Sequence, residues 1–360
     1  MVQIMNTSHI KTDVKKLPNS QVEISVIIPI AEVETFRKKA IAQFKETVEI
    51  DEFRKGHVPE SKLIEHVGET GLLAQMADEA LTESYASIIT QSNINPIGRP
   101  TIQITKLAPE NDVEYVITTD VMPTITLDDV KKIAKEKNKT ALETAVTDEE
   151  VEKALKEIRQ MRAHQKMHED GVDHHDHNHQ NIDEKDLPEV DEAFVKSLGN
   201  FESVEDFMNK LKENMSKEKE VNAHEKRRIE IIESVIESGI FDMPESIVEF
   251  ELNKMMEQFK YDLSMSGISI EEYAKQLGKT VNELRNDWHD AAVKRSKMQL
   301  ALEKIATDYD IKPAQEKIDE QVAQITEQYK DQNIDEARVV AYVTQTLSNA
   351  AVFDWLEEQK

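Results

Sequence analysis

The sequence predicts an α+β N-terminal domain, with a small antiparallel sheet and a helix-loop-helix, followed by an elongated all-α C-terminal domain with arms. Apolar residues that alternate in strand fashion are confined to the first 125 or so residues, and apolar residues at helical spacing dominate from residue 187 onward. The chain contains only 9 glycines and 5% aromatic residues, which argues against a Gly-rich nucleotide-binding fold and an all-β sandwich.

The first domain, residues 1–125, is expected to form a three-stranded sheet. Apolar residues alternate over residues 21–30 and again over residues 113–121, and a third strand is expected at residues 101–107. Helices are expected over residues 31–48, from residue 61, and over residues 71–92. These helices supply the helix-loop-helix that the sheet carries.

Residues 126–186 are expected to be a linker, helical at first and then flexible. Thr147 or Asp148 is a plausible N-cap, and Val151, Leu155 and Ile158 form one apolar stripe after it. The polar run that follows lacks aromatic residues and holds six of the eleven histidines. Such a composition cannot build a core and is typical of a flexible segment.

Residues 187–360 are expected to form a helical substrate-binding domain, with one long helix over residues 281–305. Leu252, Met256, Phe259 and Leu263 share a stripe with the spacing of ordinary core residues. Met255 and Met265 lie off this stripe and are candidate substrate contacts, because methionine adapts to varied partners.

Composition excludes several classes of function. The 45 Lys and Arg stand against 71 Asp and Glu, for a net charge of −26, which argues against a broad nucleic-acid-binding face and against DNA as a partner. No stretch approaches the ~18 apolar residues of a membrane span, and no apolar run follows a basic N-terminus, so we expect a cytoplasmic protein without membrane contact. Phosphate-binding loops, dinucleotide-binding turns and the usual hydrolase motifs are missing from the sequence, so no cofactor is expected.

The stretch DEFRKGHVPE, residues 51–60, stands out in this acidic chain. Phe53 precedes two cations, Arg54 and Lys55; Gly56 permits a positive φ, and Pro59 suits the start of the next helix. One interpretation is an ordinary turn with Phe53 folded back onto the helices. The other is a docking element for a surface made of RNA and protein.

Four segments carry a resemblance to the trigger factor family. FRKGHVP, residues 53–59, resembles the family's ribosome-docking signature Gly-Phe-Arg-x-Gly-x-x-Pro; Phe53, Arg54, Gly56 and Pro59 match it, whereas Glu52 stands where the family usually has Gly. INPIGRP (94–100), VTDEEVEKAL (146–155) and LPEVDEAFVKSLG (187–199) are similar to other family segments.

The resemblance implies a ribosome-associated, ATP-independent chaperone that docks near the exit tunnel of the large subunit and shields nascent and unfolded polypeptides. Docking would use Phe53, Arg54, Lys55, Gly56 and Pro59, and the free protein would be a possible homodimer. The family's isomerase domain of roughly a hundred residues has no counterpart in the 25 or so residues between 162 and 187, which are too few for a core. We therefore expect a shortened trigger factor without enzymatic activity.

Two alternatives stay open at this point. The His-rich segment 164–179 indicates a metal-binding protein, with His174, His175, His177 and His179 as candidate ligands, although their spacing fits no fixed tetrahedral site. The charge at Glu52 is compatible with a helical interaction module that no longer binds ribosomes.

Overall fold

The computed structural model describes residues 9–50, 53–54, 56–169, 187–330 and 334–360. The chain falls into two compact units, Met1–Leu127 with Gly239–Lys304, and Asp128–Ser238 with Ile305–Lys360. Each unit is therefore built from two separate stretches of the sequence.

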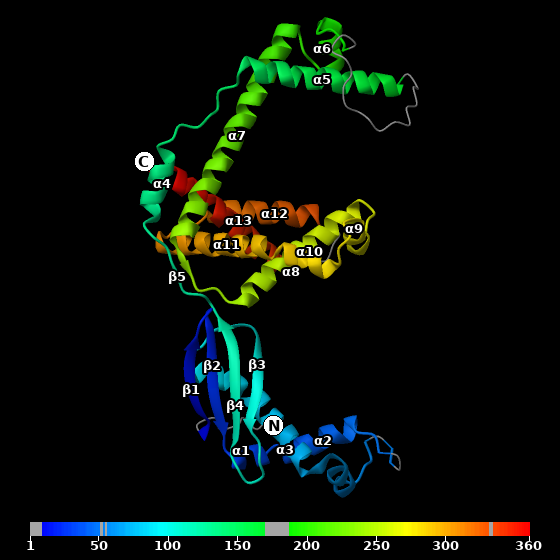
Figure 1. The fold of residues 1–360 in the computed structure, drawn as a ribbon, viewed down its shortest axis with the longest axis vertical. Coiled ribbons are helices and arrows are strands. Elements are labelled where there is room, and N and C mark those ends of the chain that lie inside the picture. Colours follow the sequence, from blue (N-terminus) through cyan, green and yellow to red (C-terminus); the bar gives the residue numbers. More distant parts are fainter. Residues whose placement is uncertain (1–8, 51–52, 55, 170–186, 331–333) are drawn as a thin grey trace. The chain divides into compact units, whose positions relative to one another are not determined.

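A four-stranded antiparallel sheet forms the N-terminal part of the first unit (Figure 1). Its strands are β1 (Lys11–Leu17), β2 (Gln21–Ile28), β3 (Pro96–Lys106) and β4 (Val113–Val121), in the order β1-β2-β4-β3. The expected antiparallel sheet is confirmed, but the expectation of three strands is wrong because β1 adds a fourth. Most β1 side chains are exposed, so this strand lacks the alternating pattern that identified β2 and β4.

One face of the sheet packs on three helices, α1 (Ile30–Glu34), α2 (Arg37–Thr47) and α3 (Glu60–Gln91). Ile24 of β2 lies opposite Ile117 of β4, and both are fully buried in the core shared with α3. Tyr115 is buried beside them, and its hydroxyl donates a hydrogen bond to the Ala77 carbonyl of α3 at 2.6 Å. Burial raises the pKa of Tyr115 far above its usual value, so this phenol remains a neutral donor.

Glycine explains a break inside α3. Gly68 has φ +75° and ψ +156°, a conformation outside the helical region. The two helices expected from residue 61 and over residues 71–92 are thus one element interrupted at Gly68.

The first unit also contains a short antiparallel strand pair, with one strand from each of its two stretches, and a set of helices from its second stretch. Strand β5 (Ile125–Thr126) pairs with β6 (Ile240–Phe241), and the helices are α8 (Glu245–Met265), α9 (Ile270–Gln276), α10 (Val281–Asp287) and α11 (His289–Asp308), whose last residues belong to the second unit. The long helix expected over 281–305 is therefore interrupted at Trp288, which caps α10. Leu252 and Met256 are buried and Phe259 and Leu263 pack against them, which confirms the predicted core stripe.

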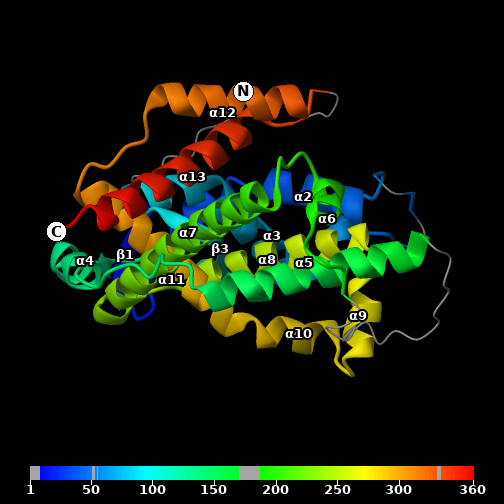
Figure 2. The same cartoon turned by 90° about the horizontal axis from the view of Figure 1, so that it is seen from above.

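The second unit is helical among its described residues. It consists of α4 (Val130–Asn138), α5 (Asp148–Glu169), α6 (Glu192–Leu198), α7 (Val204–Ser238), α12 (Gln315–Gln328) and α13 (Glu336–Glu357), with α12 and α13 side by side (Figure 2). Thr147 is the N-cap of α5, because its hydroxyl accepts a hydrogen bond from the Glu150 amide while the Glu150 carboxylate accepts one from the Thr147 amide.

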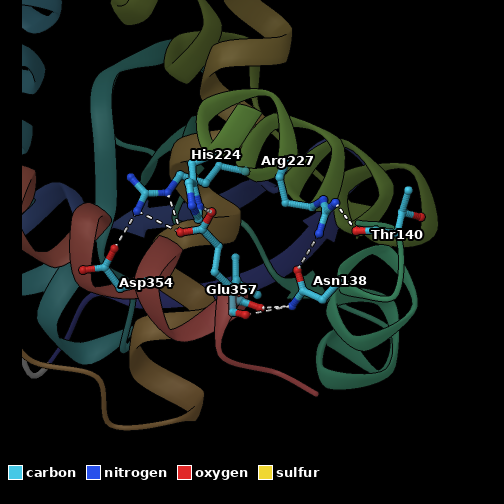
Figure 3. A network of polar contacts seen from close by, with 8 residues as sticks. Asn138, Thr140, His224, Arg227, Asp354 and Glu357 are labelled. Carbon is cyan, nitrogen blue, oxygen red and sulfur yellow. Dashed lines mark hydrogen bonds and ion pairs between the residues drawn. The ribbon is translucent and has the colours of Figure 1, made fainter. Parts of the chain in front are cut away.

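A polar network joins α4, α7 and α13 (Figure 3). The Asn138 side chain donates to the carbonyls of Leu356 and Gln359, both at 2.8 Å, and so satisfies the C-terminal end of α13. Arg227, which is buried, donates to the Thr140 carbonyl at 2.6 Å. Further polar contacts connect α7 to the same end of α13: Arg228 forms ion pairs with Asp354 and Glu357, and His224 Nδ1 lies 2.7 Å from the Glu357 carboxylate. Polar contacts thus fix the junction of the three helices.

Candidate functional site

The candidate docking loop connects α2 to α3, and its described part is residues 48–50, 53–54 and 56–59. Backbone hydrogen bonds among the described residues hold it: the Phe53 amide donates to Ile50, the Gly56 amide to Lys45, and the His57 amide to Arg54, at 2.9, 3.0 and 2.9 Å. Because one of these bonds returns to the last turn of α2, the loop is tied to its own helix.

Phe53 is folded back rather than held out into solvent. It is half-buried and packs against the N-terminal core, as Val48 and Ile50 also do. On the other side of the turn, Val58 is 2% exposed and belongs to that core. Apolar side chains therefore fix both ends of the loop, and Arg54, Gly56 and His57 are exposed between them.

Gly56 and Pro59 shape the turn as the sequence indicates. Gly56 has φ +85°, a conformation that strains any residue with a Cβ, although the space around it is open. Pro59 has φ −59° and immediately precedes α3, and its carbonyl accepts hydrogen bonds from Lys62 at 3.1 Å and Leu63 at 3.0 Å. The loop therefore enters α3 in a defined direction.

Some cations of α2 and of the loop already have a carboxylate partner, and others have none in the described part of the chain. Lys39 of α2 is 2.8 Å from Glu79, a hydrogen bond that raises the pKa of Lys39. Arg37 lies 3.8 Å from Glu69. Arg54 is exposed and has no carboxylate partner among the described residues, so its guanidinium can still bind an external phosphate or carboxylate. Lys55, with Asp51 and Glu52, lies outside the described residues.

The two candidate substrate contacts occupy different environments on α8. Met265, at the last position of the helix, is 73% exposed. Met255 is half-buried and packs against the α8 core cluster, which differs from the expectation that it lies off the buried stripe. Phe250 and Tyr261, which the sequence interpretation did not single out, are 72% and 62% exposed on the same helix.

The candidate metal ligands His174, His175, His177 and His179 lie outside the described residues. Within the ranges that the structure describes, no group of three or more His, Cys, Asp or Glu residues could hold a metal ion. Nor does any helix in those ranges have the length and apolar character needed to cross a membrane.

Sequence reasoning missed the residues that position the loop. The half-buried Ile50 and the buried Val58 pack against the core on either side of the exposed turn, and Leu63, which is fully buried, follows in the first turn of α3. The available signal was the presence of isolated apolar residues in a polar loop, which is typical of a segment pinned to a core.

Comparison with known proteins assigns the chain to a family. The model described as "Bacterial trigger factor protein (TF)" matches residues 10–158, and the one described as "Bacterial trigger factor protein (TF) C-terminus" matches residues 203–360. The trigger factor of Halalkalibacterium halodurans is 24% identical over an alignment covering 91% of this chain and 92% of its own. That of Staphylococcus carnosus is also 24% identical, with 88% of each chain covered.

A solved structure from work on promiscuous substrate recognition by the trigger factor chaperone covers 97% of this chain and 100% of its own, with a TM-score of 0.49 and 15% identity. The two family models together match most of the sequence, including the loop and both compact units. This chain belongs to the trigger factor family.

Proposed function

We propose that this protein is a ribosome-associated, ATP-independent chaperone of the cytoplasm that docks near the exit tunnel of the large subunit and shields nascent and unfolded polypeptides. The observation that carries the proposal is the loop between α2 and α3. Its ends are fixed in the core, and it exposes Arg54, an arginine without a carboxylate partner among the described residues, in a chain of net charge −26.

The loop residues have separate roles in this proposal. Arg54 and Lys55 bind phosphate or carboxylate groups of the ribosome. The exposed part of Phe53 packs against the ribosomal surface beside these groups. Gly56 and Pro59 set the backbone of the turn through the φ angles described above. Since most other surface charge is acidic, electrostatic repulsion disfavours broad adhesion to ribosomal RNA, and contact is restricted to this loop.

Clients bind the helical part, with Met265 and Met255 as contacts. Three exposed apolar side chains along α8, those of Phe250 near its start and of Tyr261 and Met265 in its last turns, suit varied apolar segments. Met255 contributes from the edge of the core cluster. Binding must be weak, because a client has to leave without a nucleotide cycle.

We also infer a chaperone without isomerase activity, organised as residues 1–125, a linker 126–186 and a chaperone domain 187–360. The two family matches leave residues 159–202 between them, and part of that interval is already used by α5 and α6. The alignment with the H. halodurans relative spans 405 positions, more than the 360 residues of this chain. A homodimer of the free protein is part of the same proposal. Metal binding through His174, His175, His177 and His179 stays an untested alternative, because these residues lie outside the described part of the chain.

Ribosome co-sedimentation tests the proposal. We expect the intact chain to pellet with ribosomes and the triple variant Phe53→Ala, Arg54→Ala, Lys55→Ala to remain in the supernatant. Arg295→Ala is the matched control, because this arginine is also exposed but lies on α11. Equal pelleting of the triple variant and the control would contradict docking through the loop.

A further inference from the structure

The two edge strands of the N-terminal sheet, β1 and β3, differ in how their outer edges are protected. Strand β1 carries Lys11, Lys15 and Lys16, and lysines on an edge strand discourage pairing with another chain. Residues 101–105 of β3 read Thr-Ile-Gln-Ile-Thr, without a charge, and all five are exposed. Such a β-branched, uncharged segment is typical of strands that pair with another chain.

The backbone of β3 is open on its outer side. The strand pairs with β4 alone, and in the described part of the chain no other backbone hydrogen bond involves residues 101–106. On an edge strand, about half of the N–H and C=O groups point away from the neighbouring strand. Figure 1 shows β3 at one edge of the sheet, beside β4. These groups can be satisfied by a further strand.

The apolar face of the sheet extends onto β3 without being fully covered. Ile102 lies opposite Ile117, and Ile104 opposite Tyr115, so these isoleucines share the core-facing side of the sheet. Ile117 and Tyr115 are buried, whereas Ile102 and Ile104 are 46% and 41% exposed. A strand added beside β3 would cover them with its own alternate side chains.

The charges on β3 restrict the sequence of such a strand. Arg99 and Lys106 are the only charged residues of β3, and both are basic. Lys106 lies 3.3 Å from Glu114, and no ion pair of Arg99 is found within the described residues. The edge therefore favours a neutral or acidic segment over a basic one.

We propose that the outer edge of β3 binds an extended, non-native polypeptide segment by strand addition, with apolar side chains at alternate positions and a neutral or acidic charge. Backbone hydrogen bonds to residues 101–106 would provide affinity largely independent of sequence, and Ile102 and Ile104 would select an apolar face. The inference rests on the proposed chaperone function and adds a client contact on the N-terminal sheet, separate from α8.

The direct test is fluorescence anisotropy of the full chain with a labelled synthetic peptide. The probe is a segment of roughly six to eight residues of alternating Val and Thr with a Glu at each end. We expect Ile104→Lys to weaken binding about tenfold or more, because it puts a charge on the apolar face that the peptide must cover. Ile104→Val should retain binding.

Val14→Lys on β1 is the matched control. Val14 is 40% exposed, close to the 41% of Ile104, and lies opposite the buried Ile24 on the same side of the sheet. We expect this variant to bind the peptide like the wild type. Equal loss of binding in both lysine variants, or no loss in Ile104→Lys, would overturn the proposal.

A second comparison uses the unmodified chain and does not depend on how any variant folds. Two N-methylated peptides are compared, one methylated at the odd-numbered residues and the other at the even-numbered residues. Each lacks the N–H groups along one edge of the strand and keeps those along the other edge. One methylated peptide should lose binding, and the unmethylated peptide should protect amides of residues 101–106 from hydrogen exchange. Equal binding of both methylated peptides, or an absence of protection, would overturn strand addition.

Two other outcomes are distinguishable. If sedimentation shows a dimer that Ile104→Lys abolishes, and the peptide does not bind, then a second copy of the chain occupies the edge and the proposal is wrong. Ribosome co-sedimentation of Ile104→Lys should equal that of the wild type. If the chain pellets with ribosomes but does not bind the peptide, this inference alone is overturned. If the chain does not pellet with ribosomes, the peptide-binding measurement still tests strand addition independently.

Discussion

The N-terminal sheet region and the helical regions differ in how their apolar cores are arranged and in how polar contacts join their helices. In the sheet region, nineteen buried apolar residues of the described chain form one cluster, and they come from the strands, from helices α1–α3, from Ile10 just before β1 and from loop residue Val58. The cluster of α8–α11 has six buried residues, and ion pairs such as Arg285 with Glu249 join its helices as well. In the second unit, the network around Asn138 joins α4, α7 and α13. From this difference we expect the sheet region, which carries the candidate docking loop, to depend mainly on one apolar core, and the helical regions to depend also on single polar groups.

The largest effect is expected from the core beneath the candidate docking loop. Leu63 is fully buried one turn after Pro59, and Leu63→Ala should cost about 2–5 kcal/mol, because it leaves a cavity among packed side chains. Hydrogen exchange of β4 amides measures the loss, since both tryptophans lie outside this region. The exposed Leu277→Ala serves as the control. If hydrogen-exchange protection of the β4 amides were unchanged in Leu63→Ala, the core beneath the loop would not stabilise the sheet region. The contrast between the two regions would then be wrong.

The next effect is expected at the helix junction of the second unit. Asn138→Ala removes the donor to the carbonyls of Leu356, Glu357 and Gln359 and should cost about 1–3 kcal/mol. Trp355 fluorescence is the readout, because Trp355 lies on α13 with its ring 4.4 Å from that of Tyr309. Asn222→Ala, an exposed change on α7, should have little effect. If the two variants unfold alike, polar contacts do not fix this junction.

A smaller effect is expected from a helix cap. The Thr280 hydroxyl accepts from the Glu283 amide at 3.2 Å, and the Glu283 carboxylate accepts from the Thr280 amide at 2.8 Å. Thr280→Ala should destabilise the α8–α11 cluster by about 1 kcal/mol, and Thr280→Ser by much less. Unfolding followed by Trp288 fluorescence measures both variants, because Trp288 packs in that cluster. Equal destabilisation by the two substitutions would point to a loss of packing rather than of the cap.

The smallest effect is a pH dependence confined to the helical region. A hydrogen bond to Glu245 raises the pKa of His289 above its usual value of about 6.5. The protonated pair therefore stabilises fully below the unfolded-state pKa, and its contribution disappears as pH rises through the raised folded-state pKa. Titration of His289 by NMR should show the raised pKa, and Glu245→Gln should move it toward the ordinary value. A pKa of His289 at or below 6.5 in the intact chain would contradict this pair.

Sequence patterns predicted the parts of the fold in which burial is periodic. Strands β2 and β4 alternate, and α8 carries the stripe that includes Leu252, so each was located correctly. Strand β1 was not predicted, because it is held by pairing with β2 and has no alternating buried face of its own. The break at Trp288 was missed because the apolar spacing continues across it.

The candidate site was predictable in its residue types but not in its packing. The motif around Phe53 located the loop, but whether Phe53 points inward depends on a core assembled from strands far along the chain. The Asn138 network could not be predicted, because Arg227 is 89 residues away in the sequence and the α13 carbonyls are more than 200 residues away. Contacts at such separation leave no local pattern.

Site-specific photocrosslinking on ribosomes carrying a nascent chain tests the division of labour between the two regions most directly. A photoreactive residue replaces His57, which is exposed next to the turn at Arg54, or, in a separate variant, Met265 on α8. We predict that position 57 labels the large ribosomal subunit and that position 265 labels the nascent chain. Labelling of the nascent chain from position 57, with no ribosomal product, would contradict docking through the loop.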